Sequence, residues 1–140
     1  MAISFHPALG TIVICDFHGF VEPEMVKRRL AIVMSPNFKG RDNLCTIIPF
    51  STTPPKPEMP YHYKLLLDRP FPPPYDSPFQ WVKADMLATV SFSRLSIPSS
   101  GKSKDGQRIY IQRCIAGSDL KKIQECMLNA MGLSSLTKHL

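Results

Sequence analysis

The chain has 140 residues, 44% of them hydrophobic, which is enough to furnish one domain with a single core. Seventeen lysines and arginines against eleven acidic residues give a net charge of +6, which favours an anionic partner such as nucleic acid or an acidic protein. No segment approaches the roughly 18 continuous apolar residues of a membrane span, and no signal-like N-terminus is present, so we expect a cytoplasmic protein with no membrane contact.

Neither the cysteines nor the histidines have the spacing of a metal site. The four cysteines form no C-x-x-C pair, and three lie in apolar runs, as small core residues do. The four histidines lie in loops or near the termini and include no H-x-x-x-H pattern. We therefore expect no metal ion and no cofactor.

Buried strands are predicted in the first 50 residues, at 11–17, 30–35 and 45–50, where β-branched and other apolar residues run together. Turn-forming residues separate these segments at 18–19 and 36–43. Residues 54–78 follow, a proline-rich insertion that cannot form a central strand because proline lacks the N–H donor. We interpret it as an extended rim with a short strand at 63–67, or alternatively as a floppy surface insertion.

Further strands are expected at 79–84 and 107–113, the second half-exposed because polar and apolar residues alternate, with a polar loop at 96–106 between them. A C-terminal helix is indicated by apolar residues spaced by three and four, with Ser118 as the N-cap and Gly132 at the C-terminal end. The apolar residues of this helix are Leu120, Ile123, Met127, Ala130 and Met131. The pattern predicts a mainly β or α+β small barrel, occupying residues 1–140 as one domain.

Charged residues gather just before the predicted second strand. Glu24 is followed by Lys27, Arg28 and Arg29, and three cations so close together are poorly neutralised by one carboxylate, so an external anion is an attractive partner. A charge run of this kind is more often a solvated loop.

Two further polar groups follow predicted strands. Ser51 and Thr52 come after the third strand, where hydroxyls could hold a phosphate or simply form a Ser/Thr turn. Lys83 and Asp85 would share one face if their strand continued, and they could act as acid and base or merely neutralise each other.

The order of these segments resembles the PemK/MazF toxin family. The resemblance is carried by residues 10–17, by 24–29 leading into 31–36, by 47–52, by 82–85, by Arg94-Leu95 and by the closing helix. It implies an SH3-like barrel of strongly bent antiparallel strands with a C-terminal α-helix. It also implies a homodimer that cleaves single-stranded RNA without metal and is inhibited by a cognate antitoxin protein.

The same resemblance implies roles for individual residues. Arg29 would stabilise the charge of the transition state, Ser51 or Thr52 would donate a hydrogen bond to the phosphate, and Glu24 or Asp85 would be the base. The base removes the proton of the RNA 2′-OH, which attacks the adjacent phosphorus. Lys27, Arg28 and Lys83 would bind RNA. The sequence departs from the family at Leu30, Ser51, Met86 and Ala88, and the last two changes remove polar groups near the expected RNA path.

Two other functions remain open at this point. The same barrel could bind RNA or a protein without cutting, or it could poison a topoisomerase through its C-terminal helix. The longer proline-rich insertion is also expected to restrict which RNA sequences enter, with Tyr61, Tyr63 or Phe71 offering faces on which bases stack.

Overall fold

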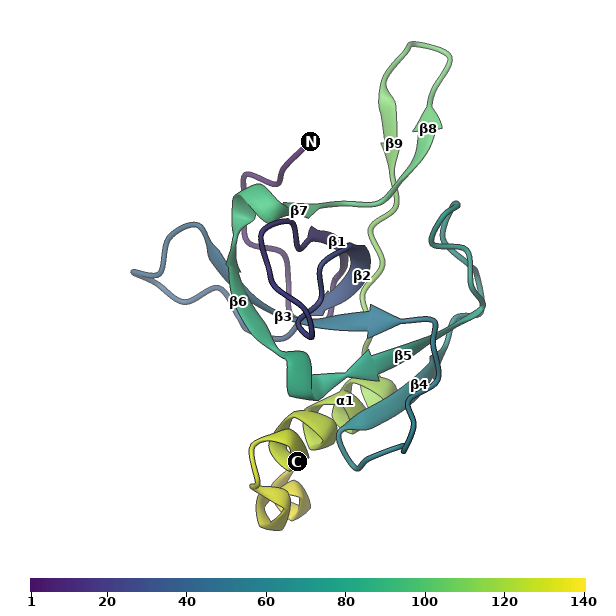
Figure 1. Ribbon diagram of the computed structural model, residues 1–140. Coiled ribbons are helices and arrows are strands. Elements are labelled where there is room, and N and C mark those ends of the chain that lie inside the picture. Colours follow the sequence, from purple (N-terminus) through teal and green to yellow (C-terminus); the bar gives the residue numbers. More distant parts are fainter.

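The computed structural model describes residues 1–140 as a curved antiparallel sheet packed on one C-terminal helix (Figure 1). The strands of the main sheet are β1 (Ile12–Asp16), β2 (Arg28–Val33), β3 (Leu44–Ser51), β4 (His62–Leu66), β5 (Phe79–Lys83), β6 (Ala88–Ser91) and β7 (Leu95–Ser96). A separate hairpin of β8 (Ser99–Lys102) and β9 (Arg108–Tyr110) projects from the body, and the helix α1 (Gly117–Ala130) follows it. Short 3₁₀ turns are η1 (Ala84–Met86), η2 (Phe92–Arg94) and η3 (Ser134–His139).

The sheet bends around β3, its longest strand. The strand order is β4-β5-β3-β2-β1-β7, and β6 pairs with the first half of β3, while β5 pairs with its last two residues, Phe50 and Ser51. The bent antiparallel sheet and C-terminal helix confirm the expected fold class. The sheet does not close into a barrel, because the outer strands β4 and β7 do not pair with each other.

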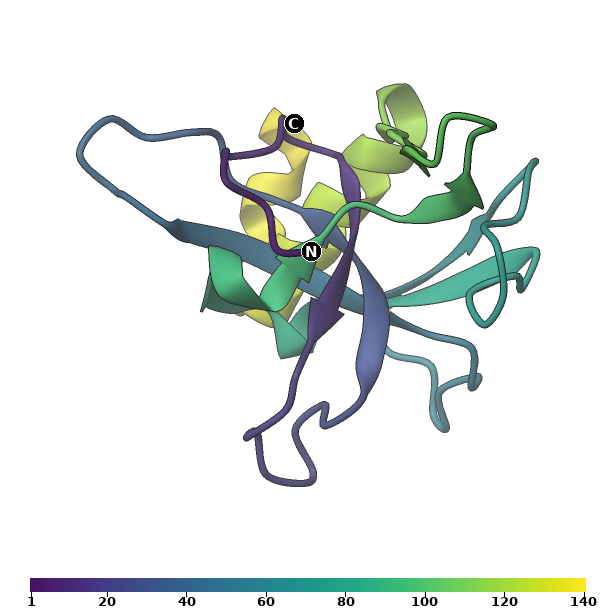
Figure 2. The same ribbon diagram turned by 90° about the horizontal axis from the view of Figure 1, so that it is seen from above.

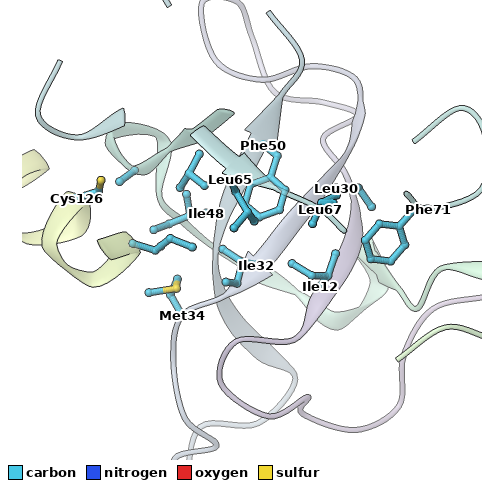
Figure 3. Close-up of a cluster of buried hydrophobic side chains, with 13 residues drawn as sticks. Ile12, Leu30, Ile32, Met34, Ile48, Phe50, Leu65, Leu67, Phe71 and Cys126 are labelled. Atoms are coloured by element: carbon cyan, nitrogen blue, oxygen red, sulfur yellow. The ribbon is translucent and has the colours of Figure 1, made fainter. Parts of the chain in front are cut away.

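The core has two parts because alternate residues of a strand point to opposite faces. On β2, Leu30 and Ile32 belong to one cluster, and Ala31 and Val33 to the other. Figure 3 shows the first cluster running from Phe71 at one end to Cys126 of α1 at the other. Three cysteines are buried and all four are free, which confirms the prediction of small core residues.

The start of β1 is fastened to the segment that enters α1. The Ile12 N–H donates to the Arg113 carbonyl at 2.8 Å, and the Ile115 N–H donates to the Gly10 carbonyl at the same distance. Gly10 has φ +90°, and a Cβ atom there would lie 2.3 Å from the Ile115 carbonyl oxygen. Only glycine fits this close approach.

Two details of the C-terminal half differ from the sequence-based prediction. Helix α1 begins at Gly117 with Ala116 in the N-cap position and no side-chain cap, so Ser118 is not the cap, whereas Gly132 lies just beyond the helix with φ +74° as expected. The predicted loop at 96–106 contains β8, and the predicted strand at 107–113 shortens to β9. This hairpin is largely solvent-exposed, so no buried face marks its strands in the sequence.

The proline-rich insertion is tied to the body of the protein. After β4, Leu67 and Phe71 enter the first core cluster. Arg113 lies over the Phe71 ring, with its guanidinium carbon 4.6 Å from the ring centroid, and it bonds the Asp68 carboxylate and the Arg69 carbonyl. Phe71 is only 2% exposed, so the hypothesis that bases stack on it is wrong. No helix has the length and apolarity that a membrane span requires.

Candidate active site

Three of the five sequence-predicted catalytic residues, Arg29, Ser51 and Thr52, line one cavity of about 350 Å³. The cavity lies where β2 begins and β3 ends, with a wall formed by the proline-rich insertion. The remaining lining residues are Arg28, Leu30, Phe50, Pro74, Tyr75 and Gln80. We call this cavity the arginine cavity.

Arg29 is the second residue of β2, which starts two residues earlier than the sequence predicted. The extension arises because β2 pairs with β1 as far as Arg28, opposite Asp16. The β2–β3 register aligns Ala31 with Pro49, and continuing it by two residues brings Arg29 opposite Ser51. Arg29 itself pairs only with β1, and both Arg29 and Ser51 line the arginine cavity.

The Arg29 guanidinium is partly removed from water. Its Nε atom is buried and has no hydrogen-bond partner, and burial lowers the pKa of the side chain. An arginine with an unmatched N–H stays cationic at neutral pH and retains donors for an external acceptor. The cavity can therefore receive an anion such as a phosphate.

Ser51 and Thr52 differ in how the fold uses their hydroxyls. Ser51 ends β3, is 5% exposed, and its Oγ accepts a hydrogen bond from the Thr53 N–H at 3.1 Å. Thr52 is exposed, and its hydroxyl makes no hydrogen bond within the chain. Each hydroxyl keeps its own proton for donation to a ligand.

Among the other predicted cations, Arg28 also lines the arginine cavity, whereas Lys27 and Lys83 do not. Arg28 forms an ion pair with Asp16 at 3.3 Å, and both side chains are accessible to solvent. Lys27 is exposed on the β1–β2 connection, which extends away from α1 in Figure 2. Lys83 ends β5 half-buried, and its charge adds to the larger effect of burial in lowering the pKa of the nearby His62 ring.

Glu24 and Asp85 lie in a different cavity, also of about 350 Å³, which shares no lining residue with the arginine cavity. Its other walls are mainly apolar and include Phe17, Phe20 and Met86. Oε1 of Glu24 accepts the Val21 N–H at 2.8 Å. The strand premise for Lys83 and Asp85 is wrong, because β5 ends at Lys83 and the chain turns into η1.

Sequence reasoning missed His62 as a neighbour of Asp85. Its side chain is 8% exposed, and its Nε2 lies 4.0 Å from Oδ1 of Asp85. Burial lowers the pKa of His62, against the opposing effect of Asp85. The pairing depends on β4 lying against β5, with His62 opposite Lys83, which no local spacing reveals.

Tyr75 and Gln80 were also missed as cavity residues. Burial raises the pKa of Tyr75, and the nearby Arg28 opposes that effect. Gln80 is only 4% exposed, on the same face of β5 as the core residue Val82. The sequence did contain a signal for Gln80: in the strand expected at 79–84 it lies two residues from Val82, and so on the same face as a core residue.

Comparison with known proteins matches this chain to the family described as PemK-like, MazF-like toxin of type II toxin-antitoxin system, over residues 8–124. The uncharacterized protein YifN of Escherichia coli K12 is 27% identical, covering 97% of this chain and 99% of YifN. An uncharacterized protein of Haemophilus influenzae is 28% identical, covering 97% of this chain and 98% of its own length.

Solved structures share the fold at low sequence identity. MazF of Deinococcus radiodurans superposes with a TM-score of 0.60 at 18% identity, covering 92% of this chain and 99% of that one. A mycobacterial endoribonuclease solved in complex with its cognate antitoxin has a TM-score of 0.59 at 17% identity, covering 91% and 96%. The family match includes the whole arginine cavity, and this chain therefore belongs to the PemK-like, MazF-like toxin family of type II toxin-antitoxin systems.

Proposed function

We propose that this protein is a toxin that cleaves single-stranded RNA without a metal ion. The observation that carries the proposal is that Arg29, Ser51 and Thr52 line one cavity in a chain of this toxin family. A cationic, partly desolvated arginine beside two hydroxyl donors is suited to a phosphate whose negative charge increases during reaction. The structural neighbours named as endoribonucleases support the same reaction class.

The proposed reaction uses the substrate's own nucleophile. A base takes the proton of the 2′-OH, the 2′ oxygen forms a bond to the adjacent phosphorus, and the bond from phosphorus to the 5′ oxygen breaks. The products are a 2′,3′-cyclic phosphate and a 5′-OH, which receives a proton. Arg29 stabilises the charge on the phosphorane, and Ser51 or Thr52 donates to a non-bridging oxygen.

Glu24 and Asp85 are the proposed alternatives for the base. Both line the cavity that is separate from the arginine cavity. One of them would therefore reach the 2′-OH either because the bound RNA spans both cavities or because a second copy of the chain supplies it. Separate Glu24→Gln and Asp85→Asn variants distinguish them, because only the variant lacking the base should lose the acidic limb of its pH–rate profile, in which the cleavage rate rises as the base deprotonates.

We further propose a cytoplasmic protein of one domain that acts as a homodimer and is held inactive by a small antitoxin protein. MazF of Deinococcus radiodurans has been solved together with MazE, which supports an antitoxin partner. Lys27, Arg28 and Lys83 are the proposed RNA-binding cations, acting on the phosphates through charge.

The test is to incubate the protein with mixed-sequence single-stranded RNA in EDTA and to identify the ends produced. We expect cyclic phosphates from the wild type and from Arg69→Ala, a control that removes an exposed arginine outside the cavity, and a rate lower by about 100-fold for Arg29→Ala. Intact RNA that still binds would instead indicate a non-catalytic module. Intact RNA with inhibition of a DNA topoisomerase would indicate the third function.

A further inference from the structure

The arginine cavity adjoins a further cavity of about 280 Å³, which is distinct from the one that Glu24 and Asp85 line and which we call the second cavity. The arginine cavity and the second cavity share Arg28 and Tyr75 as lining residues. The second cavity lies between the proline-rich insertion and the base of the β8–β9 hairpin, with Pro72 and Pro73 on one side and Ser99 and Arg108 on the other. Figure 1 shows this hairpin and the chain between β4 and β5 projecting beside each other. The lining residues of the two cavities therefore form one continuous surface from Arg29 past Tyr75 to Arg108.

Gln80 is the unexplained polar group on this surface. It occupies a core-facing position of β5, opposite Leu65, and is 4% exposed. Its side-chain amide makes no hydrogen bond within the chain, and its polar atoms stay accessible where the residue lines the arginine cavity. The amide therefore offers a free donor and a free acceptor to a ligand that enters the cavity. The donor and acceptor together match the edge of a nucleobase.

Tyr75 supplies an aromatic wall on a supported loop. The tyrosine follows Phe71, which is buried in the core, and the loop is held to the body by Arg113 through Asp68 and the Arg69 carbonyl. The Tyr75 N–H also donates to the Pro72 carbonyl at 3.0 Å. An aromatic ring held in this way can stack on a base with little loss of conformational entropy.

Positive charge continues beyond Tyr75 along the hairpin. Arg108 lines the second cavity and forms no ion pair, and Lys102 and Lys104 lie on the same hairpin, also without an acidic partner. Asp105 is the one acidic residue between Ser99 and Tyr110. Unpaired cations along an exposed hairpin attract the phosphates of a strand that leaves the first cavity.

We infer that the arginine cavity contains a base-reading subsite, in which Tyr75 stacks on a nucleobase and the Gln80 amide pairs with its edge, while the RNA continues toward Arg108. This inference rests on the proposed RNA cleavage and adds the residues that choose the sequence cut. The phosphate contacts of Arg28 and Arg108 position the strand, and Gln80 is the group that distinguishes one base from another.

The test compares cut sites in a mixed-sequence RNA for the wild type, Gln80→Leu and Gln124→Leu. Gln124 lies on α1 outside both cavities and is the matched control. We expect Gln80→Leu to keep cutting but to lose about ten-fold in preference for the favoured base, and the control to retain the wild-type profile. An unchanged profile in a folded, active Gln80→Leu protein would overturn the inference while leaving the cleavage proposal intact.

A binding measurement separates this inference from the chemistry. Single-stranded oligonucleotides lacking every 2′-OH cannot be cut by the proposed route, so fluorescence anisotropy reports binding alone. We expect wild-type affinity to depend on the base at one position, Gln80→Leu to remove that dependence, and Tyr75→Ala to weaken binding about ten-fold for every base. Equal affinity for all bases in the wild type would contradict the subsite whether or not the protein cleaves RNA.

Discussion

Nε2 of His62 lies 4.0 Å from Oδ1 of Asp85, while Nδ1 of the same ring accepts a hydrogen bond from the Met59 N–H at 3.0 Å. The bond at Nδ1 fixes the neutral tautomer with its proton on Nε2, facing the carboxylate. The ring is therefore oriented by the loop before β4 and presented to a residue that follows β5. This relationship leads to a prediction about pH.

Protonation of His62 should destabilise the fold. Burial lowers the pKa of His62 from its ordinary value of 6.5, so at slightly acidic pH the unfolded chain binds a proton that the folded chain resists. The free energy of unfolding should therefore decrease as the pH falls below about 6.5, through the lowered pKa of the folded state. Urea unfolding at pH 7.5 and 5.5 measures this change. His62→Gln should reduce the decrease, and the exposed His18→Gln should not; an equal decrease in all three proteins would contradict the prediction.

The two hydroxyls at the end of β3 should separate stability from activity. Ser51→Ala removes the acceptor of the Thr53 N–H and should cost about 1 kcal/mol of unfolding free energy. Thr52→Ala removes no intramolecular bond, so stability should be unchanged while RNA cleavage slows about ten-fold, through loss of a donor to the phosphate. Urea unfolding and single-turnover cleavage distinguish the two effects. Full activity of Thr52→Ala would leave Ser51 as the phosphate donor.

Arg113 should hold the proline-rich insertion in place. Arg113→Ala removes the cation–π contact with Phe71 and the bond to Asp68, and should lower the free energy of unfolding by about 1 kcal/mol. It should also speed chymotrypsin cleavage after Tyr75, because the loop would open more often. Arg69→Ala is the control, since only its backbone carbonyl is used. Unchanged proteolysis in Arg113→Ala would show that Phe71 alone holds the loop.

Phe71 should act as a core residue. Phe71→Ala should cost about 3–5 kcal/mol, because the side chain is 2% exposed within the first cluster. Phe5, which is 48% exposed, provides the comparison: Phe5→Ala should cost less than about 1 kcal/mol. Thermal or urea unfolding measures both. A small effect at Phe71 would contradict its role as a stabilising core residue.

The sequence predicted the positions of elements in which apolar residues run together or recur with a clear period. β1, β2 and β3 are strongly apolar, and the Ile123 face of α1 recurs every three to four residues, so these elements could be located within a few residues. β6 and β7 are short, and their pairing depends on partners far away in the chain, for example Val90 with Cys45. Local patterns carry no information on such pairs.

The candidate site was predictable to a similar extent. Arg29 and Ser51 flank neighbouring strands, so their proximity could be anticipated once antiparallel pairing was assumed. The separation of Glu24 and Asp85 from that cavity follows from the turn at Ala84 and the course of the β1–β2 connection, neither of which has a sequence signature. The contribution of Tyr75 depends on how the prolines fold back, which composition does not specify.

The contact between residues 10–12 and 113–115 has a consequence for synthesis on the ribosome. β1 emerges early, but the segment that pairs with its start emerges only when nearly the whole chain has been made. Until then the Ile12 N–H lacks its hydrogen-bond partner, and the core cluster to which Ile12 belongs lacks Ile123 of α1. A ribosome-bound nascent chain thus cannot complete its core, and a message truncated before α1 would yield a chain that lacks Ile123 and Cys126 of the first core cluster.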